Sequence, residues 1–117
     1  MSARSRSVRT AAAVTGSAPV FAALGDRTRL RLVARLGTEG PLSIARLTDG
    51  LDLTRQAVAK HLHVLEDARV ARGVRQGRER RWELQKEPLD AARRSLESIG
   101  RRWDEALLRL QAAVEDD

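Results

Sequence analysis

The segment TRQAVAKHLHVLEDARVARGVRQGRERRWEL, Thr54–Leu84, decides the fold of this 117-residue chain. In its first half, Val58, Leu62 and Leu65 follow one another at spacings of four and three, so they share one face of a helix. A threonine is a good N-cap, because its side-chain oxygen can accept a hydrogen bond from the first turn. We therefore predict an amphipathic helix that Thr54 caps and that ends at about Ala68.

After this helix the hydrophobic period changes from that of a helix to that of a strand. Residues 70–75 can form one strand, and residues 80–84 a second whose Trp82 and Leu84 lie on one face. Gln76-Gly77 between them is a turn signal. The pattern predicts a β-hairpin with arginines at its tip.

Three shorter helices are predicted upstream, over residues 19–24, 27–36 and 43–49. Asp26 and Ser43 are suited to cap the second and third of them. Gly37 is expected to end the second helix, and Gly40-Pro41 to form a turn after it. Residues 1–18 are rich in Ser, Ala and Arg without an apolar period, so we expect a disordered basic N-terminal arm there.

The last helix is predicted from about Pro88, a residue that suits a first helical turn. Apolar residues recur in it at two heptad positions: Leu89, Leu96, Trp103 and Leu110 at one, and Ala92, Ile99, Ala106 and Ala113 at the other. Roughly 26 residues span about 39 Å, more than so small a domain can cover. We therefore expect part of the stripe to pack on the chain's own core and the rest on a second copy.

These elements divide the chain into an arm, 1–18, a winged helix-turn-helix core, 19–86, and a C-terminal dimerisation helix, 87–117. The fold class expected is mainly α with a small β-hairpin, dimerising through the terminal helices. The residues predicted to form the dimer interface are Phe21, Leu89, Leu96, Ile99, Trp103, Leu107 and Leu110. For Trp103, a place in the dimer or intrachain core is the first interpretation, and the wall of a small-molecule pocket is the alternative.

Composition excludes several classes of function. The chain has no cysteine, which excludes disulfide scaffolds, thiolate metal sites and cysteine nucleophiles, and it has no apolar run long enough to span a membrane. The net charge is +6, and residues 54–81 hold eight cations against three acids. A basic surplus concentrated on a helix and hairpin favours a polyanionic partner.

A recognition helix buries one face and presents polar groups on the other, and its N-terminal part usually contacts the bases. Arg can donate two hydrogen bonds to guanine, and Gln pairs in the same way with adenine. Arginines of the wing tip suit phosphates or the minor groove. The predicted partner is double-stranded DNA, and the predicted contacts are Thr54, Arg55, Gln56, Ala57, Lys60, His61, Arg75, Arg78 and Arg80.

Residues 21–110 resemble the ArsR/SmtB family of bacterial repressors. Three segments carry the resemblance: LGDRTRLRLVARL (Leu24–Leu36), LTRQAVAKHLHVLEDARV (Leu53–Val70) and RQGRERRWEL (Arg75–Leu84). The resemblance implies a homodimer built from the first and last helices, binding to an inverted-repeat operator, and repression that a signal relieves. It also implies a bacterial cytoplasmic protein associated with the nucleoid.

The chain departs from the family pattern at several positions. Ser43 and Ala45 stand where metal-sensing members carry a Cys-x-Cys pair, and the last helix contains no histidine. We therefore expect no metal site and no cofactor, and an effector that the sequence does not identify. Arg27 replaces a frequent proline. Arg69 replaces the usual glycine before the first strand, and a left-handed conformation there would cost roughly 1 kcal/mol.

Two further interpretations stay open at this point. His61 matches a family position and is a candidate for DNA contact, whereas His63 is expected at the surface. A winged-helix module for protein–protein assembly is the alternative function, although its contact face would more often be apolar. Catalysis is not expected, because no nucleophile–base order and no phosphate loop appears.

Overall fold

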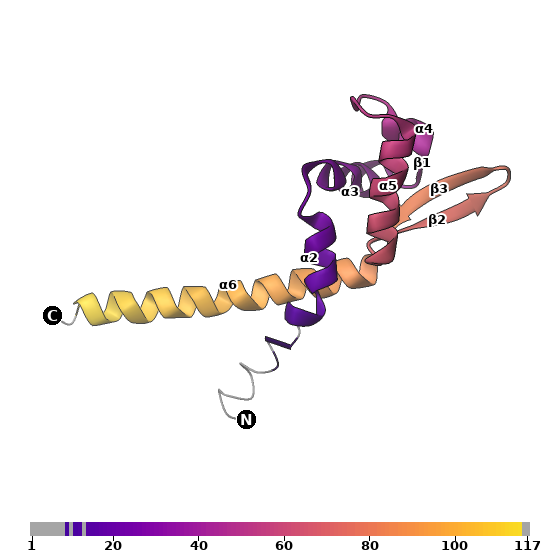
Figure 1. Ribbon diagram of the computed structural model, residues 1–117. Coiled ribbons are helices and arrows are strands. Elements are labelled where there is room, and N and C mark those ends of the chain that lie inside the picture. The colour runs from indigo at the N-terminus through magenta and orange to yellow at the C-terminus, as the bar shows by residue number, and fades with distance from the viewer. Residues whose placement is uncertain (1–8, 10, 13, 116–117) are drawn as a thin grey trace.

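The computed structural model describes residue 9, residues 11–12 and residues 14–115 (Figure 1). Its elements, in chain order, are α2 (Ala18–Leu24), α3 (Arg27–Glu39), β1 (Leu42–Ser43), α4 (Ile44–Thr48), α5 (Arg55–Asp67), β2 (Ala71–Gln76), β3 (Glu79–Leu84) and α6 (Lys86–Glu115). The described chain is mostly helical with one small antiparallel sheet, which confirms the predicted mainly α fold with a small β-hairpin.

Three polar side chains begin the helices of the helix-turn-helix core. Asp26 Oδ2 accepts a hydrogen bond from the Arg29 amide at 3.0 Å, which caps α3. Ser43 Oγ and Thr54 Oγ1 cap α4 and α5 in the same way, at 3.3 and 3.1 Å from amides three residues on. All three predicted caps are confirmed, because such a cap depends only on residues within one turn.

The core lies between α3, α4, α5 and the base of the hairpin. Its fully buried large side chains are Leu32, Leu47, Val58, Leu62, Leu65 and Val70. The residues from α5 are those whose spacing predicts the helix. Burial of this one face orients α5 and leaves its opposite face to solvent.

The sheet has three strands in the order β1-β3-β2, one more than predicted. In β1, Leu42 pairs with Trp82 and Ser43 with Arg81. A strand of two residues carries no alternating pattern, so only the approach of β3 creates it. The turn also lies further along than predicted, after Gln76, with Gly77 at a φ of 64°.

Helix α3 continues past Gly37, and the prediction that this glycine ends the helix is wrong. The helix ends at Glu39, and Gly40 follows it with a φ of 81°. A glycine inside a helix costs only about 1 kcal/mol. Here the next turn adds a hydrogen bond from Thr38 Oγ1 to the Ala34 carbonyl and an ion pair between Arg35 and Glu39 at 2.9 Å.

The predicted disordered arm is wrong for the part of it that the structure describes. Arg9, residues 11–12 and residues 14–16 are helical, and Ser17 is buried. Thr15 Oγ1 donates to the Ala11 carbonyl at 2.7 Å. Arg4 and Arg6 lie outside the described residues.

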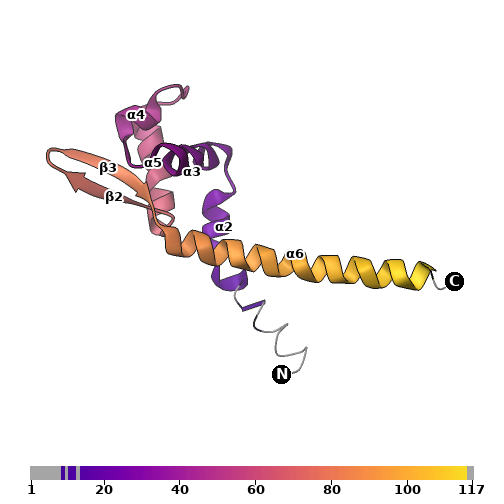
Figure 2. The ribbon, with the colours of Figure 1, turned by 180° about the vertical axis from the view of Figure 1, so that it is seen from behind.

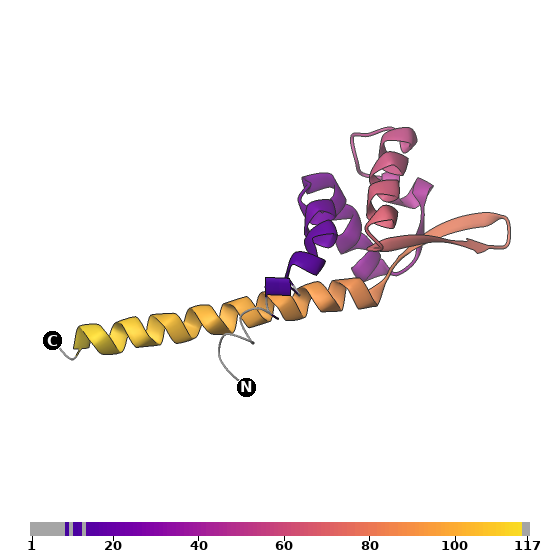
Figure 3. The same cartoon turned by 60° about the horizontal axis from the view of Figure 1, so that its bottom comes forward.

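Helix α6 is 30 residues long and begins two residues before Pro88. It passes across α2, and its C-terminal half then extends beyond the rest of the molecule in all three views (Figures 1, 2 and 3). The hairpin projects at the other end, and the molecule measures 67 × 29 × 20 Å. None of the helices in the described ranges combines the length and hydropathy that a membrane span requires.

Candidate nucleic-acid interface

The face of α5 opposite the core carries the predicted contact residues. Thr54, Arg55, Gln56 and Lys60 are exposed, and Ala57 is half-buried. Arg55 and Lys60 form no ion pair or side-chain hydrogen bond within the described part of the chain. Their donors are therefore free for a partner outside the chain.

The β2–β3 hairpin, called the wing below, presents two further cations. Arg75 and Arg78 are exposed at its tip and form no ion pair with any residue that the structure describes. By contrast, Arg72 pairs with Glu83 at 2.7 Å, and Arg81 with Glu79 at 3.2 Å. The Arg72–Glu83 pair joins the two strands, and the Arg81–Glu79 pair lies within β3, whereas Arg75 and Arg78 are left for a ligand.

The sequence predicts a DNA contact for Arg80, but its guanidinium turns back toward the body of the protein. Its Cζ lies 4.6 Å from the centre of the Trp82 ring, and its Nη2 lies 3.5 Å from Glu66 Oε2. Glu66 is in the last turn of α5, and Arg80 therefore joins the wing to that helix. Arg80 thus has intrachain partners that the sequence does not indicate.

His61 is also a predicted contact, and it lies on the inner side of α5. Its Nδ1 is 3.2 Å from Arg29 Nη1 and 3.8 Å from Asp26 Oδ2, and its side chain is 24% exposed. Arg29 in turn donates from Nε to the Ala23 carbonyl at 2.6 Å. His61 therefore connects α5 to the α2–α3 corner rather than facing the surface that Arg55 occupies.

The same corner perturbs one carboxyl group. The Arg29 amide that donates to Asp26 lowers the pKa of that carboxyl below its usual value, although desolvation opposes the effect. The positive Arg29 side chain and the nearby His61 lower it further. Asp26 thus stays ionised and serves as a cap at the start of α3.

His63 is mostly exposed, as expected, but it has two neighbours that the sequence does not indicate. Its ring meets Trp82 edge-on with ring centres 5.8 Å apart, and its Nδ1 is 3.5 Å from Glu66 Oε1. Glu66 Oε2 also accepts a long hydrogen bond from the Gly73 amide at 3.4 Å. Neither Glu66 nor Gly73 stands out in the sequence, because their partners lie on other elements.

The end of α5 directs the chain into the wing. Arg69 has a φ of 61°, its amide donates to Glu66 O, and the Val70 amide donates to Leu65 O, both at 2.9 Å. This pair of bonds is a Schellman motif, which usually places a glycine at the left-handed position. In this chain an arginine therefore occupies the position that a glycine usually takes.

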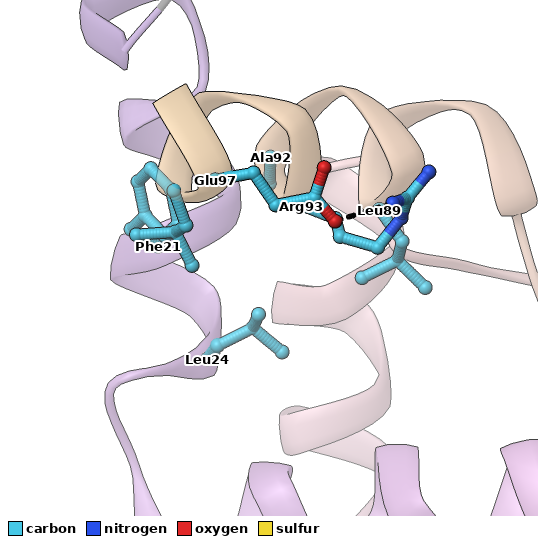
Figure 4. A pocket seen from close by; sticks show the side chains of 7 residues that line it. Phe21, Leu24, Leu89, Ala92, Arg93 and Glu97 are labelled. Carbon is cyan, nitrogen blue, oxygen red and sulfur yellow. Dashed lines mark hydrogen bonds and ion pairs between the residues drawn. The ribbon is translucent and has the colours of Figure 1, made fainter. Parts of the chain in front are cut away.

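A groove of about 420 Å³ runs between α2 and α6 (Figure 4). Phe21 and Leu24 form one side, and Leu89, Ala92 and Leu96 form the other. Arg93 and Glu97, 2.6 Å apart, lie at its edge. The lining is largely apolar, which suits a hydrophobic side chain more than a polar ligand.

The predicted interface residues extend this groove along α6. Phe21 and Leu89 are half-buried against the core, whereas Leu96, Ile99, Leu107 and Leu110 are exposed. Trp103 is 66% exposed, so its interpretation as part of the intrachain core is wrong. Among the residues from 14 to 115 and the few described before them, no three His, Cys, Asp or Glu gather as a metal site would require.

Comparison with known proteins gives consistent matches. The helix-turn-helix domain model matches residues 24–74. The HTH-type transcriptional regulator YuzN of Bacillus subtilis (strain 168), itself described as uncharacterized, is 41% identical over 76 residues, which are 60% of this chain and 83% of that protein. The HTH-type transcriptional regulator Rv2034 of Mycobacterium tuberculosis is 39% identical over 85 residues, 73% of this chain and 76% of that protein.

Solved structures show the same relationship. An ArsR-like transcriptional regulator from Rhodococcus sp. RHA1 superposes with a TM-score of 0.69 at 38% identity, covering 82% of this chain and 90% of that one. The chain therefore belongs to the ArsR family of winged helix-turn-helix, DNA-binding transcriptional regulators.

Proposed function

We propose that the chain is a homodimeric, sequence-specific repressor that places α5 in the major groove of an inverted-repeat operator. Arg55 and Gln56 contact base edges, Thr54 and Lys60 contact the backbone, and Ala57 permits close approach. The wing lies on the adjacent backbone or minor groove through Arg75 and Arg78. His61 and Arg80 support these elements from within the protein.

The observation that carries this proposal is the distribution of unpaired cations. Wing and helix cations that face inward or across the hairpin have acidic or aromatic partners, such as Arg72 and Arg80. Arg55, Lys60, Arg75 and Arg78 have none within the described residues. Cations left unpaired on an exposed helix and an adjoining hairpin tip match a polyanion that spans both.

A homodimer supplies a second recognition helix for the second half-site of the operator. The exposed stripe on α6 and the groove at Phe21 and Leu89 are apolar and continuous. A two-fold pair would bury both, which favours the terminal helices as the interface. Two recognition helices related in this way read an inverted repeat.

We also propose that repression is relieved by a signal other than a thiolate-bound metal. Ser43, at the position of the family's first metal-binding cysteine, is nearly buried and its hydroxyl caps α4. It therefore has a structural role here. The effector acts on other residues.

Mobility shift against the promoter of the chain's own gene tests the function, with an equal mass of random-sequence duplex as competitor. We expect a promoter complex that resists the competitor and whose log K falls with log salt at a slope near −4 to −5, because about four to six cations per dimer release counterions. Binding without preference for the promoter would overturn sequence-specific recognition. No binding to any duplex would favour the assembly module instead.

A further inference from the structure

Glu66 stands where the recognition helix meets the base of the wing. It lies in the last turn of α5, and its carboxylate faces the Gly73 amide of β2 at 3.4 Å and the Arg80 guanidinium of β3 at 3.5 Å. The two contacts join α5 to residues 7 and 14 positions further along the chain, one on each strand of the wing. Glu66 is therefore the acid through which α5 holds both strands of the wing.

Gly73 leaves the space that this contact needs. It is the register partner of Trp82, and a methyl group at Gly73 would overlap the Arg80 guanidinium, with Nη2 only 2.6 Å away. The guanidinium thus crosses β2 at its one residue without a side chain. There it lies over the buried Trp82 ring and within reach of Glu66.

We propose that Glu66, Gly73, Arg80 and Trp82, called the wing-base cluster, fix the angle between the wing and the recognition helix. Glu66 and Arg80 are positioning residues that raise operator affinity without touching DNA. This inference rests on the proposed function, because it assumes that α5 and the wing tip bind one duplex together. It replaces the direct phosphate contact that the sequence predicts for Arg80.

The geometry makes the wing tip sensitive to this attachment. Gly77 lies four residues beyond Gly73, which is about 13 Å along a strand. A rotation of about 10° at the base would then move the tip by about 2 Å, and a hydrogen bond to phosphate does not survive a displacement of that size. Arg75 and Arg78 can reach the backbone together with Arg55 only while the base is held.

The two roles of Arg80 predict opposite effects for removal of Glu66. If Arg80 contacts phosphate, Glu66→Ala frees a cation and removes a negative charge, so DNA binding stays equal or tightens. If the wing-base cluster positions the wing, the same change weakens binding even though it makes the protein more basic. Alanine is favourable in a helix, so the substitution does not disturb α5 itself.

The experiment measures operator affinity of the full chain by fluorescence anisotropy from about 50 to 200 mM salt. Glu66→Ala is expected to weaken binding roughly three- to tenfold and to flatten the salt slope by about 1 to 3, because the tip cations leave the phosphates. Glu83→Ala is the matched control. It also removes one acid from the hairpin, but its ion-pair partner Arg72 belongs to the hairpin itself and not to α5.

Two further variants test the wing-base cluster without changing the net charge of the protein. Gly73→Ala displaces the Arg80 guanidinium without changing the net charge and should reproduce the weaker binding. Arg80→Lys keeps the charge but removes the guanidinium that lies over the Trp82 ring, so it should also weaken binding, whereas a phosphate contact would tolerate lysine. Helical circular dichroism and the unfolding midpoint establish that each variant is folded.

Two results would overturn the inference and leave the proposed function intact. One is equal or tighter operator binding by folded Glu66→Ala. The other is an unchanged salt slope for Glu66→Ala together with wild-type binding by Arg80→Lys. Equal weakening in Glu66→Ala and Glu83→Ala would also overturn it, because the effect would then not depend on the link to α5. Failure of the wild-type protein to distinguish operator from random duplex would instead overturn the proposed function.

Discussion

Arg55 and Arg78 are both exposed cations without an intrachain partner among the described residues, yet they lie on different elements and should act differently. Arg55 is in the first turn of α5, the part of a recognition helix that usually contacts the bases. Arg55→Ala is expected to reduce discrimination between operator and altered operator by about 1–3 kcal/mol. Arg78→Ala should weaken binding to all sequences alike and flatten the salt slope by about 2, because each of the two protomers loses one cation that neutralises a phosphate.

Competition binding against a panel of single-base operator variants measures this difference. A drop in discrimination in Arg78→Ala equal to that in Arg55→Ala would contradict the assignment of the wing to backbone contacts. Arg94→Ala, which changes an exposed arginine on α6, serves as the matched control and should change neither quantity.

Asp26 predicts a dependence of stability on pH. Its pKa is lowered in the folded protein, chiefly by the hydrogen bond from the Arg29 amide. A carboxyl with a lowered folded-state pKa stabilises the protein fully above its unfolded pKa, near 3.8. That contribution is lost as the pH falls through this value toward the folded pKa. We expect the urea midpoint of unfolding to drop between about pH 5 and pH 3.

Asp26→Asn isolates this contribution. Asparagine caps a helix about as well as aspartate but does not titrate. Glu39, whose pKa is lowered by Arg35, titrates in both proteins and cancels in the comparison. The variant's midpoint should therefore fall less steeply with pH. Parallel curves for the two proteins would show that Asp26 does not contribute.

At the scale of elements, the end of α5 carries a measurable strain. Arg69 holds the left-handed position of a Schellman motif, where a Cβ costs roughly 1–2 kcal/mol. Arg69→Gly is expected to raise the free energy of unfolding by about 1 kcal/mol, measured by urea denaturation at fixed protein concentration. Arg31→Gly in α3 is a control of opposite sign, because glycine inside a helix destabilises by about 1 kcal/mol.

A decrease in stability in Arg69→Gly would mean that the arginine side chain stabilises the protein by more than its left-handed backbone conformation costs.

Helix starts could be predicted from neighbouring residues, whereas the end of α3 could not. The caps at Asp26, Ser43 and Thr54 follow from the sequence, whereas Gly37 does not stop α3. A cap needs only neighbours in the chain, but the length of a helix also depends on what its last turn packs against.

At the scale of the whole molecule, the exposed apolar stripe of α6 predicts a dimer. A charged substitution on the stripe should dissociate this dimer, whereas one on another face of α6 should not. Trp103 and Leu107 lie on the stripe, while Leu108 is about 100° further round the helix from Leu107. Leu108 is as exposed as Trp103, at 65% against 66%. Trp103→Glu should therefore convert the protein to a monomer in sedimentation at micromolar concentration, and Leu108→Glu should leave the dimer intact.

A wild-type monomer under these conditions would contradict the dimer. Equal dissociation by both substitutions would contradict the assignment of the interface to the heptad stripe. Because each protomer of the proposed dimer binds one half-site, the Trp103→Glu monomer should also bind the full operator much more weakly. Its affinity for a single half-site should be kept.

The sequence by itself determined the elements and their surfaces. Hydrophobic period placed α5, the wing and α6, capping residues placed the helix starts, and an uneven charge distribution indicated α5 and the wing as a candidate DNA-binding surface. These are local properties, since each depends on residues within one or two turns or on a repeated spacing. They were enough to indicate a winged helix-turn-helix.

Only the tertiary structure decided which cations remain available. His61 is turned toward Arg29, 32 residues earlier in the chain, and Arg80 toward Glu66, 14 residues earlier. The two-residue strand β1 likewise exists only because β3 lies beside it. An arginine in a sequence is equally suited to a phosphate or to a carboxylate. The tertiary structure determines which partner each arginine has, because it brings an acid or an aromatic ring within reach of some arginines and leaves the others in solvent.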